Sequence, residues 1–327
     1  MTESITRSIT RSIGGQTVSA IGLGSMAFAT REAANRAERT IHAALDAGIT
    51  LIDTADAYTP DAADMGFNER QVASALASYP GDTSGVLVAT KGGHTRTPGG
   101  GWGLDGRPEY LRAACDASLK ALGVEAIGLY QHHRPDPKVP YADTVGALAE
   151  LRDAGKIRLV GLSNANVELI EIARSILGPD GLASVQNELS PNYRDDLPEI
   201  VPHCAANGIA YLPWSPLGGI SAAGGLGAAH PMFAEVAAER GVSPQQVCLA
   251  WLLAQAPVVI PIPGASRPES IINSAGAAVL ELTPEELTRL NGSSPRFPRV
   301  VEFRGSAGVP DPRNSTTQRG AERASWR

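Results

Sequence analysis

The sequence is poor in cysteine, in long apolar runs and in metal-binding patterns, and each shortage excludes a class of protein. Its three cysteines, Cys115, Cys204 and Cys248, are odd in number, lie far apart and lack metal-ligand spacing, which argues against a disulfide scaffold and a zinc site. We interpret them as small buried hydrophobes in a reducing compartment. No apolar run approaches the roughly 18 residues of a membrane span, and the N-terminus has no apolar signal core. We therefore expect a cytoplasmic protein with no bound metal and no membrane contact.

The charge balance gives no reason to expect an anionic macromolecular partner. The chain has 28 Lys and Arg against 34 Asp and Glu, a net charge of −6, so long-range electrostatics do not favour nucleic acid. Its 327 residues suffice for a large core, and a single α/β barrel commonly takes about 250 residues. We predict one barrel domain over residues 1–293. An Arg-, Pro- and Gly-rich tail over residues 294–327 follows, where the hydrophobic periodicity stops.

Short apolar segments alternate with amphipathic stretches along most of the chain, a pattern typical of a parallel α/β fold. The opening stretch from Ile5 to Val18 places Gly14-Gly15 between two β-prone segments, which predicts a β-hairpin that plugs one barrel end. Eight strands favour a closed (β/α)8 barrel, or TIM barrel, over an open sheet. The predicted strands lie near residues 20–23, 49–53, 86–90, 127–131, 157–162, 183–187, 209–213 and 258–262.

Capping and stop residues mark the predicted helices. They are Gly48 after a helix over residues 34–47, Asn68 as the N-cap of a helix to Ser78, Pro108 near a helix start, Gly155 after a helix over 141–154, and the openings Ser243-Pro244 and Thr283-Pro284. Long loops over residues 59–66, 92–107 and 217–231 follow predicted strands. Long loops in compact domains are usually functional or disordered, and the position of these loops at the barrel rim favours a substrate cover.

Four residues with complementary chemistry lie at or just after the ends of predicted strands. Asp53 ends one apolar run and Tyr58 follows it closely, whereas Lys91 and His133 come at the ends of two others. Strand ends meet on one rim of a parallel barrel, so these residues can lie together. A tyrosine beside an ammonium group that a carboxylate holds is suited to general acid catalysis, because the cation stabilises the phenolate and lowers the pKa from about 10. An imidazole can orient a carbonyl.

Two of these assignments have alternatives. Lys91 could form a Schiff base with a carbonyl substrate, as lysines in barrel aldolases do. His132 adjoins His133, and because side chains alternate along a strand only one of the two can face the site.

Seven short motifs follow one another along the chain: LIDTADAY, VATKGG, GLYQHHRPDP, GLSN, VQNELSP, WSPLGG and IPGASRPE. With these motifs the chain resembles the aldo-keto reductase family over roughly residues 12–292, and the last four match the family's nicotinamide-cofactor motifs in order. The resemblance implies that Asp53, Tyr58, Lys91 and His133 are the catalytic positions. It selects His133, because the family's histidine precedes Arg-Pro-Asp, and the cofactor motifs argue against a Schiff-base lysine.

The resemblance also implies a bound nicotinamide cofactor. Ser163, Asn164 and Gln186 would contact its carboxamide, which offers both donors and an acceptor, and Trp214 would stack on its ring. Arg267 with Ser266 could bind a 2′-phosphate, which favours NADP(H) over NAD(H). The full set of implied cofactor contacts is Gly24, Ser25, Met26, Ser163, Asn164, Gln186, Trp214, Ser215, Pro216, Leu217, Gly219, Gly264, Ser266, Arg267 and Asn273.

These features predict an enzyme that reduces an aldehyde or ketone with NADPH, or oxidises the corresponding alcohol, with Tyr58 as the proton donor in reduction. The predicted partner is therefore a small-molecule carbonyl compound or alcohol. The alternative is a regulatory subunit that binds the cofactor and turns over slowly, since such a protein would keep the cofactor motifs.

Overall fold

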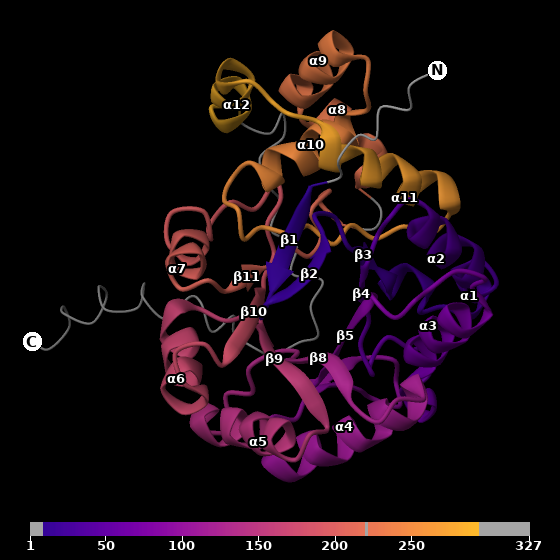
Figure 1. The fold of residues 1–327 in the computed structure, drawn as a ribbon, viewed down its shortest axis with the longest axis vertical. Coiled ribbons are helices and arrows are strands. Elements are labelled where there is room, and N and C mark those ends of the chain that lie inside the picture. The colour runs from indigo at the N-terminus through magenta and orange to yellow at the C-terminus, as the bar shows by residue number, and fades with distance from the viewer. Residues whose placement is uncertain (1–8, 220–221, 294–327) are drawn as a thin grey trace, which may run out of the picture.

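The computed structural model describes residues 9–219 and 222–293. Its centre is a curled parallel sheet of seven strands in the order β11-β10-β9-β8-β5-β4-β3, with helices around the outside (Figure 1). The strands are β3 (Leu23–Gly24), β4 (Leu51–Asp53), β5 (Leu87–Gly92), β8 (Ile127–His132), β9 (Ile157–Ser163), β10 (Leu182–Gln186) and β11 (Ala210–Tyr211). The predicted tail over residues 294–327 lies outside the described residues, so the domain boundary near residue 293 stays a prediction.

An eighth segment, residues 258–264, joins the two edges of this sheet. On the β11 side, the Tyr211 amide donates to the Val258 carbonyl at 2.8 Å. On the β3 side, the amides of Gly22 and Gly24 donate to the carbonyls of Pro261 and Pro263 at 2.9 and 3.0 Å. Two prolines without N–H groups prevent a regular ladder here, so the segment pairs through isolated bridges only. The predicted (β/α)8 barrel is confirmed, with an irregular eighth strand.

The predicted hairpin plugs one end of the barrel. Strands β1 (Thr10–Ile13) and β2 (Gln16–Ser19) pair antiparallel around Gly14 and Gly15, whose φ angles of +54° and +86° suit a two-residue turn that favours glycine. Ile13 and Val18 are buried within the same hydrophobic cluster as the inward-facing side chains of the strands. The opposite end of the barrel, where the parallel strands end, is thereby left for the site.

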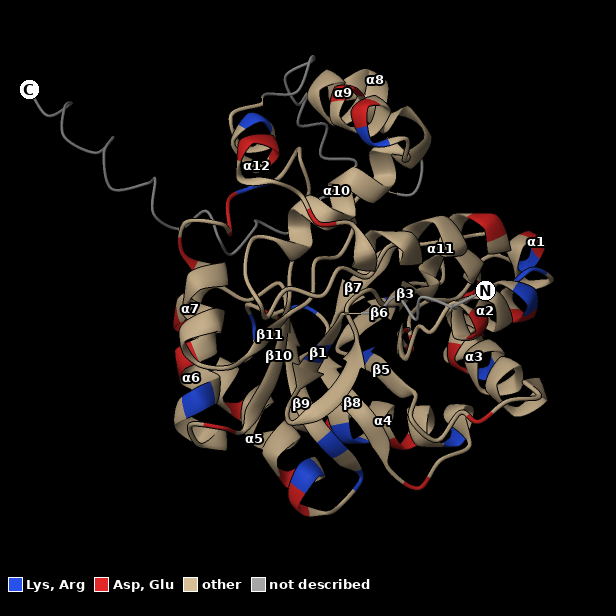
Figure 2. Cartoon of the chain, turned by 45° about the horizontal axis from the view of Figure 1, so that its top comes forward, with Lys and Arg blue, Asp and Glu red and all other residues tan. Residues whose placement is uncertain are grey.

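Helices α2 to α7 pack around the barrel in chain order, and α11 lies beside α2, whereas α8 and α9 pack on α10 and α12 packs on α9 (Figure 1). Charged residues lie mostly on these helices and on the connecting loops, and the strands carry few (Figure 2). The helices are α1 (Arg31–Ala34), α2 (Ala37–Asp46), α3 (Phe67–Ser78), α4 (Pro108–Leu122), α5 (Tyr141–Asp153), α6 (Val167–Leu177), α7 (Ile200–Ala206), α8 (Leu226–Ala229), α9 (Pro231–Arg240), α10 (Pro244–Leu253), α11 (Pro268–Ala275) and α12 (Pro284–Asn291). Within the described residues no helix has both the length and the hydropathy of a membrane span.

Most predicted helix ends are confirmed, and two are corrected. Ser243 and Thr283 form capping boxes ahead of α10 and α12. The predicted helix over residues 34–47 begins later, as α2 at Ala37, and the separate short helix α1 precedes it. Asn68 is not the N-cap of α3: Gly66, with φ of +80°, takes that position. The Asn68 side chain is instead buried, where it accepts hydrogen bonds from Ser25 and Thr54 and so ties the helix to the rim.

Two of the three long rim loops contain more structure than their sequences predict. Residues 92–107 include an antiparallel hairpin, β6 (His94–Arg96) and β7 (Trp102–Leu104). Residues 217–231 include α8 and a short 3-10 helix, Ala223–Gly225. The loop over 59–66 holds one 3-10 turn, Ala62–Asp64. These loops follow β5, β11 and β4, so they border the same barrel rim.

Candidate active site

Asp53, Tyr58, Lys91 and His133 gather at this rim, and all four are buried. The Lys91 Nζ donates hydrogen bonds to the Asp53 Oδ2 at 2.6 Å, to the Thr54 carbonyl at 2.8 Å and to the Tyr58 hydroxyl at 3.2 Å. The rings of Tyr58 and His133 meet edge to face, with centroids 5.7 Å apart. One ammonium group therefore bridges a carboxylate and a phenol beside an imidazole.

Burial and charge set the protonation of these groups. Burial raises the pKa of Tyr58, and the nearby Lys91 charge lowers it by less, so the net pKa lies above 10.0. The lowered tyrosine pKa expected from the sequence is wrong, because desolvation outweighs the effect of the ammonium. Burial alone would lower the pKa of Lys91, but Asp53 and Tyr58 together raise it above 10.5. At neutral pH the site holds a protonated phenol next to an ammonium group.

The two adjacent histidines face opposite sides of β8. His133 lies against Tyr58, whereas the His132 ring packs outward against Tyr141 of α5 at 5.5 Å. Burial, and then the neighbouring His94 ring and the Lys91 ammonium, hold the pKa of His133 well below 6.5, so its imidazole is neutral. Both ring nitrogens of His132 are buried without hydrogen-bond partners, on the side of the strand away from Tyr58.

Gln131 is a member of the site that sequence reasoning missed. Its Nε2 donates to the Asp53 Oδ1 at 3.2 Å, and the Gln186 Nε2 donates to the same oxygen at 2.8 Å. Asp53 is thus held by one ammonium and two amides. A signal was present in the sequence, because Gln131 lies two residues before His133 on one strand and therefore faces the same side. A polar residue at that inward position of an apolar strand needs a buried partner.

The residues implied to contact a carboxamide lie at the ends of neighbouring strands. Ser163 ends β9 and Gln186 ends β10, and Asn164 follows β9 with a left-handed φ of +58°, which asparagine tolerates better than most residues. The Asn164 Nδ2 donates to the His133 carbonyl at 3.0 Å, and its Oδ1 is buried with no partner. The Trp214 Nε1 is also buried without a partner. Such unpaired polar atoms suit a site that a polar ligand completes.

Other implied cofactor contacts fall into two groups. Arg267 and Gly264 are exposed ahead of α11, and the Arg267 Nε donates to the Ser270 hydroxyl at 3.2 Å. Some other implied contacts are engaged within the protein. Ser25 donates to the Asp53 carbonyl at 2.7 Å, and the Asn273 Oδ1 accepts from the Ser243 hydroxyl at 2.8 Å. The Ser25 and Asn273 side chains thus each connect two neighbouring segments of the fold.

Sequence comparison matches residues 20–294 to the model of the Aldo/keto reductase family. The chain belongs to this family. It is 36% identical over 273 residues to a probable aldo-keto reductase 1 from Glycine max, covering 76% of each chain. It is 35% identical over 243 residues to an uncharacterized oxidoreductase from Schizosaccharomyces pombe, covering 74% of each.

Solved structures of aldo/keto reductases have the same fold. A glycerol dehydrogenase from Gluconobacter oxydans is 30% identical, with a TM-score of 0.74 over 87% of this chain and 94% of that one. An aldo/keto reductase from Klebsiella pneumoniae in complex with NADP and acetate is 28% identical, with a TM-score of 0.71 over 86% and 94%. The family match and these similarities establish an oxidoreductase with the aldo/keto reductase fold.

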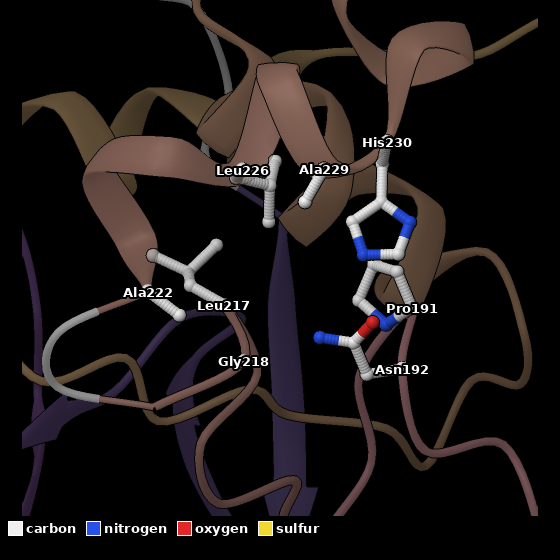
Figure 3. Close-up of a pocket in the computed structure, with 8 residues that line it drawn as sticks. All are labelled: Pro191, Asn192, Leu217, Gly218, Ala222, Leu226, Ala229 and His230. Atoms are coloured by element: carbon white, nitrogen blue, oxygen red, sulfur yellow. The ribbon is translucent and has the colours of Figure 1, made fainter. Parts of the chain in front are cut away.

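A small pocket of this aldo/keto reductase lies beside the segment Ser215–Gly219 (Figure 3). His230 lines it with both ring nitrogens buried and unpaired, opposite Leu217 and Leu226. None of Asp53, Tyr58, Lys91 and His133 contributes to its wall. The pocket therefore lies alongside a segment of implied cofactor contacts and is separate from the buried tyrosine. Its lining is Pro191, Asn192, Leu217, Gly218, Ala222, Leu226, Ala229 and His230.

Proposed function

We propose that this aldo/keto reductase interconverts a small aldehyde or ketone and its alcohol with NADP(H), and that Tyr58 donates the proton during reduction. The observation that carries the proposal is the contact chain in which Lys91 joins Asp53 and Tyr58 by hydrogen bonds of 2.6 and 3.2 Å. The nicotinamide supplies the hydride when it is bound. Unneutralised alkoxide charge would make that transfer steeply unfavourable, so a proton donor at the carbonyl oxygen is required.

Each of the four residues has a distinct part in this proposal. Tyr58 is protonated at neutral pH because burial raises its pKa, so it can give its hydroxyl proton to the substrate oxygen. The Lys91 ammonium then stabilises the tyrosinate that remains, and Asp53 keeps that ammonium charged and in place. His133 is neutral and lies against Tyr58, where an imidazole N–H can orient the carbonyl oxygen.

The chain's own polar groups support a nicotinamide dinucleotide as the cofactor. The unpaired Asn164 Oδ1 can accept a hydrogen bond from the carboxamide N–H, with Ser163 beside it. Trp214 offers an aromatic face for stacking. Arg267 is exposed at the start of α11, where a phosphate gains from both the guanidinium and the helix N-terminus. The Klebsiella relative that binds NADP is consistent with this choice.

A direct assay tests the activity. Oxidation of NADPH should be followed with a panel of aldehydes and ketones, and reduction of NADP+ with a panel of alcohols. Turnover with at least one carbonyl compound is expected. Tight NADPH binding without turnover of any of them would favour the alternative role, a regulatory subunit that senses the cofactor.

Arg267 should determine the choice between NADPH and NADH. We expect NADPH to bind more tightly, by roughly 10- to 150-fold, because a charge-assisted hydrogen bond to the 2′-phosphate stabilises the complex by about 1.5–3 kcal/mol. Arg267→Ala should remove most of that difference, as measured by fluorescence titration with both cofactors. Arg289→Ala, at an exposed arginine of α12 that pairs with Glu239, is the matched control. A wild-type preference for NADH would contradict the assignment.

The two histidines should respond differently to substitution. His133→Ala should lower kcat strongly, because it removes the imidazole beside Tyr58. His132→Leu should leave kcat close to the wild-type value, because the leucine fills the outward space and the lost ring nitrogens make no hydrogen bonds. Steady-state kinetics and thermal melts of both variants distinguish catalysis from folding. Equal losses of kcat in two folded variants would remove His133 from the site.

A further inference from the structure

The β6–β7 hairpin presents a row of stacked side chains next to His133. The His94 ring meets the His133 ring edge to face at 4.8 Å and 82°, and it stacks on Trp102 at 4.4 Å and 23°. The guanidinium carbon of Arg96 lies 4.2 Å from the centre of a Trp102 ring. In the hairpin register Arg96 pairs with Trp102, and His94 lies two residues away on the same face. The row therefore leads from His133 through His94 and Trp102 to Arg96.

The far end of this row is positively charged and lacks an acidic partner. Across residues 9–219 and 222–293, no ion pair involves Arg96, and its Nε is buried without a hydrogen-bond partner. The acidic residue of the same loop, Asp105, is already paired with Arg107 at 2.7 Å. The cation is held over an indole, which fixes its position and reduces the entropy lost when it binds a ligand.

The electrostatics around His94 agree with a local positive potential. Burial, and then the charges of Arg134 and Arg96, lower the pKa of His94 to about 3. His94 is therefore neutral at physiological pH, and its Nδ1 is buried and unpaired. The Arg96 guanidinium over Trp102 thus gives this side of the site a positive charge, in a chain whose net charge is −6. A local positive charge of this kind attracts an anion even though the molecule as a whole is negatively charged.

We propose that this face binds an anionic substituent of the substrate, so that the preferred substrate is an aldehyde or ketone that carries a carboxylate or phosphate group. The carbonyl would lie between Tyr58 and His133, the intervening carbons would pass over His94 and Trp102, and the anion would meet Arg96. A carboxylate or phosphate accepts two parallel hydrogen bonds from a guanidinium, which satisfies the unpaired Nε. This substrate class rests on the proposed carbonyl reduction.

Matched pairs of substrates test the proposal. Each pair has one neutral and one anionic carbonyl compound of similar shape: benzaldehyde with 4-carboxybenzaldehyde, butanal with succinic semialdehyde, and glyceraldehyde with glyceraldehyde 3-phosphate. The measured quantity is the ratio of kcat/KM, anionic over neutral, with NADPH. We expect a ratio of roughly ten or more in at least one pair, the scale of one charge-assisted hydrogen bond. The first two pairs test a carboxylate at different lengths, and the third tests a phosphate.

Variants assign the preference to Arg96. Arg96→Met keeps an unbranched side chain over Trp102 but removes the charge, and it should bring the ratio close to one through a higher KM for the anionic substrate. Arg112→Met, at an exposed arginine of α4 that pairs with Glu150, should leave the ratio unchanged. A wild-type ratio near one in all three pairs, or a high ratio that survives in folded Arg96→Met, would overturn the inference while leaving carbonyl reduction intact. Absence of turnover with every compound would instead reject the proposed function and this inference with it.

Discussion

Tyr58→Phe should lower kcat for carbonyl reduction by at least about 100-fold, which is the scale of general acid catalysis. Phenylalanine keeps the ring against His133 and beneath Lys91, whose Nζ lies 4.9 Å from the ring centroid, but it has no proton to give. Binding of NADPH should change little, because the implied cofactor contacts are made by other residues. Steady-state kinetics with a good aldehyde substrate and a cofactor titration measure both effects.

The pH profile gives this prediction a second readout. Because burial holds the Tyr58 pKa above 10.0, the wild-type reduction rate should be flat from neutral into mildly alkaline pH and fall only when the phenol ionises. That alkaline limb should be absent from the residual activity of Tyr58→Phe. Tyr79→Phe is the matched control, since Tyr79 is a surface tyrosine far from the site whose hydroxyl donates to Asp46 and whose ring contacts His42. Near-normal turnover of folded Tyr58→Phe would assign the proton to another group.

Periodicity and strand-end positions predicted much of this fold and site. Asp53 and Lys91 each end an apolar run, so their meeting at one site could be predicted, because parallel strands all end on one rim. The depth at which the Tyr58 side chain is buried could not be predicted from such patterns. The sequence therefore suggested a lowered Tyr58 pKa, whereas desolvation raises it. The prediction that Asn68 caps a helix was wrong for a related reason. Its residue type favours a helix cap, but its position between Ser25 and Thr54 depends on how the rim loops pack.

The contacts of Asp53 show why long-range register limits such predictions. Gln131 and Gln186 donate to one Asp53 oxygen from 78 and 133 residues away. Whether those amides reach the carboxylate depends on the stagger of the five neighbouring strands from β4 to β10, which no local pattern encodes. The β6–β7 hairpin is similar, since its strands have only three residues each and a glycine-rich turn hides their alternation.

Lys91→Met should lower the free energy of unfolding by about 3–5 kcal/mol, the cost of removing one partner of a buried ion pair. In this variant Asp53 keeps the amides of Gln131 and Gln186 but has no cation to balance its charge. Turnover should also be lost, because no ammonium remains to stabilise the Tyr58 phenolate. Denaturant unfolding and steady-state kinetics measure the two losses separately, and Lys156→Met, at an exposed pair with Asp116, is the control.

The double variant Asp53→Asn, Lys91→Met separates stability from chemistry. With both charges removed, no unpaired ion is buried, so most of the lost stability should return. The side-chain carbonyl of the new asparagine in this variant can still accept a hydrogen bond from Gln131 or Gln186, so the buried amides keep a partner. Turnover should stay as low as in Lys91→Met, because the ammonium is still missing. A stable single variant would mean that the pair contributes nothing to folding, and a double variant that regains turnover would exclude Lys91 from the proton-transfer step.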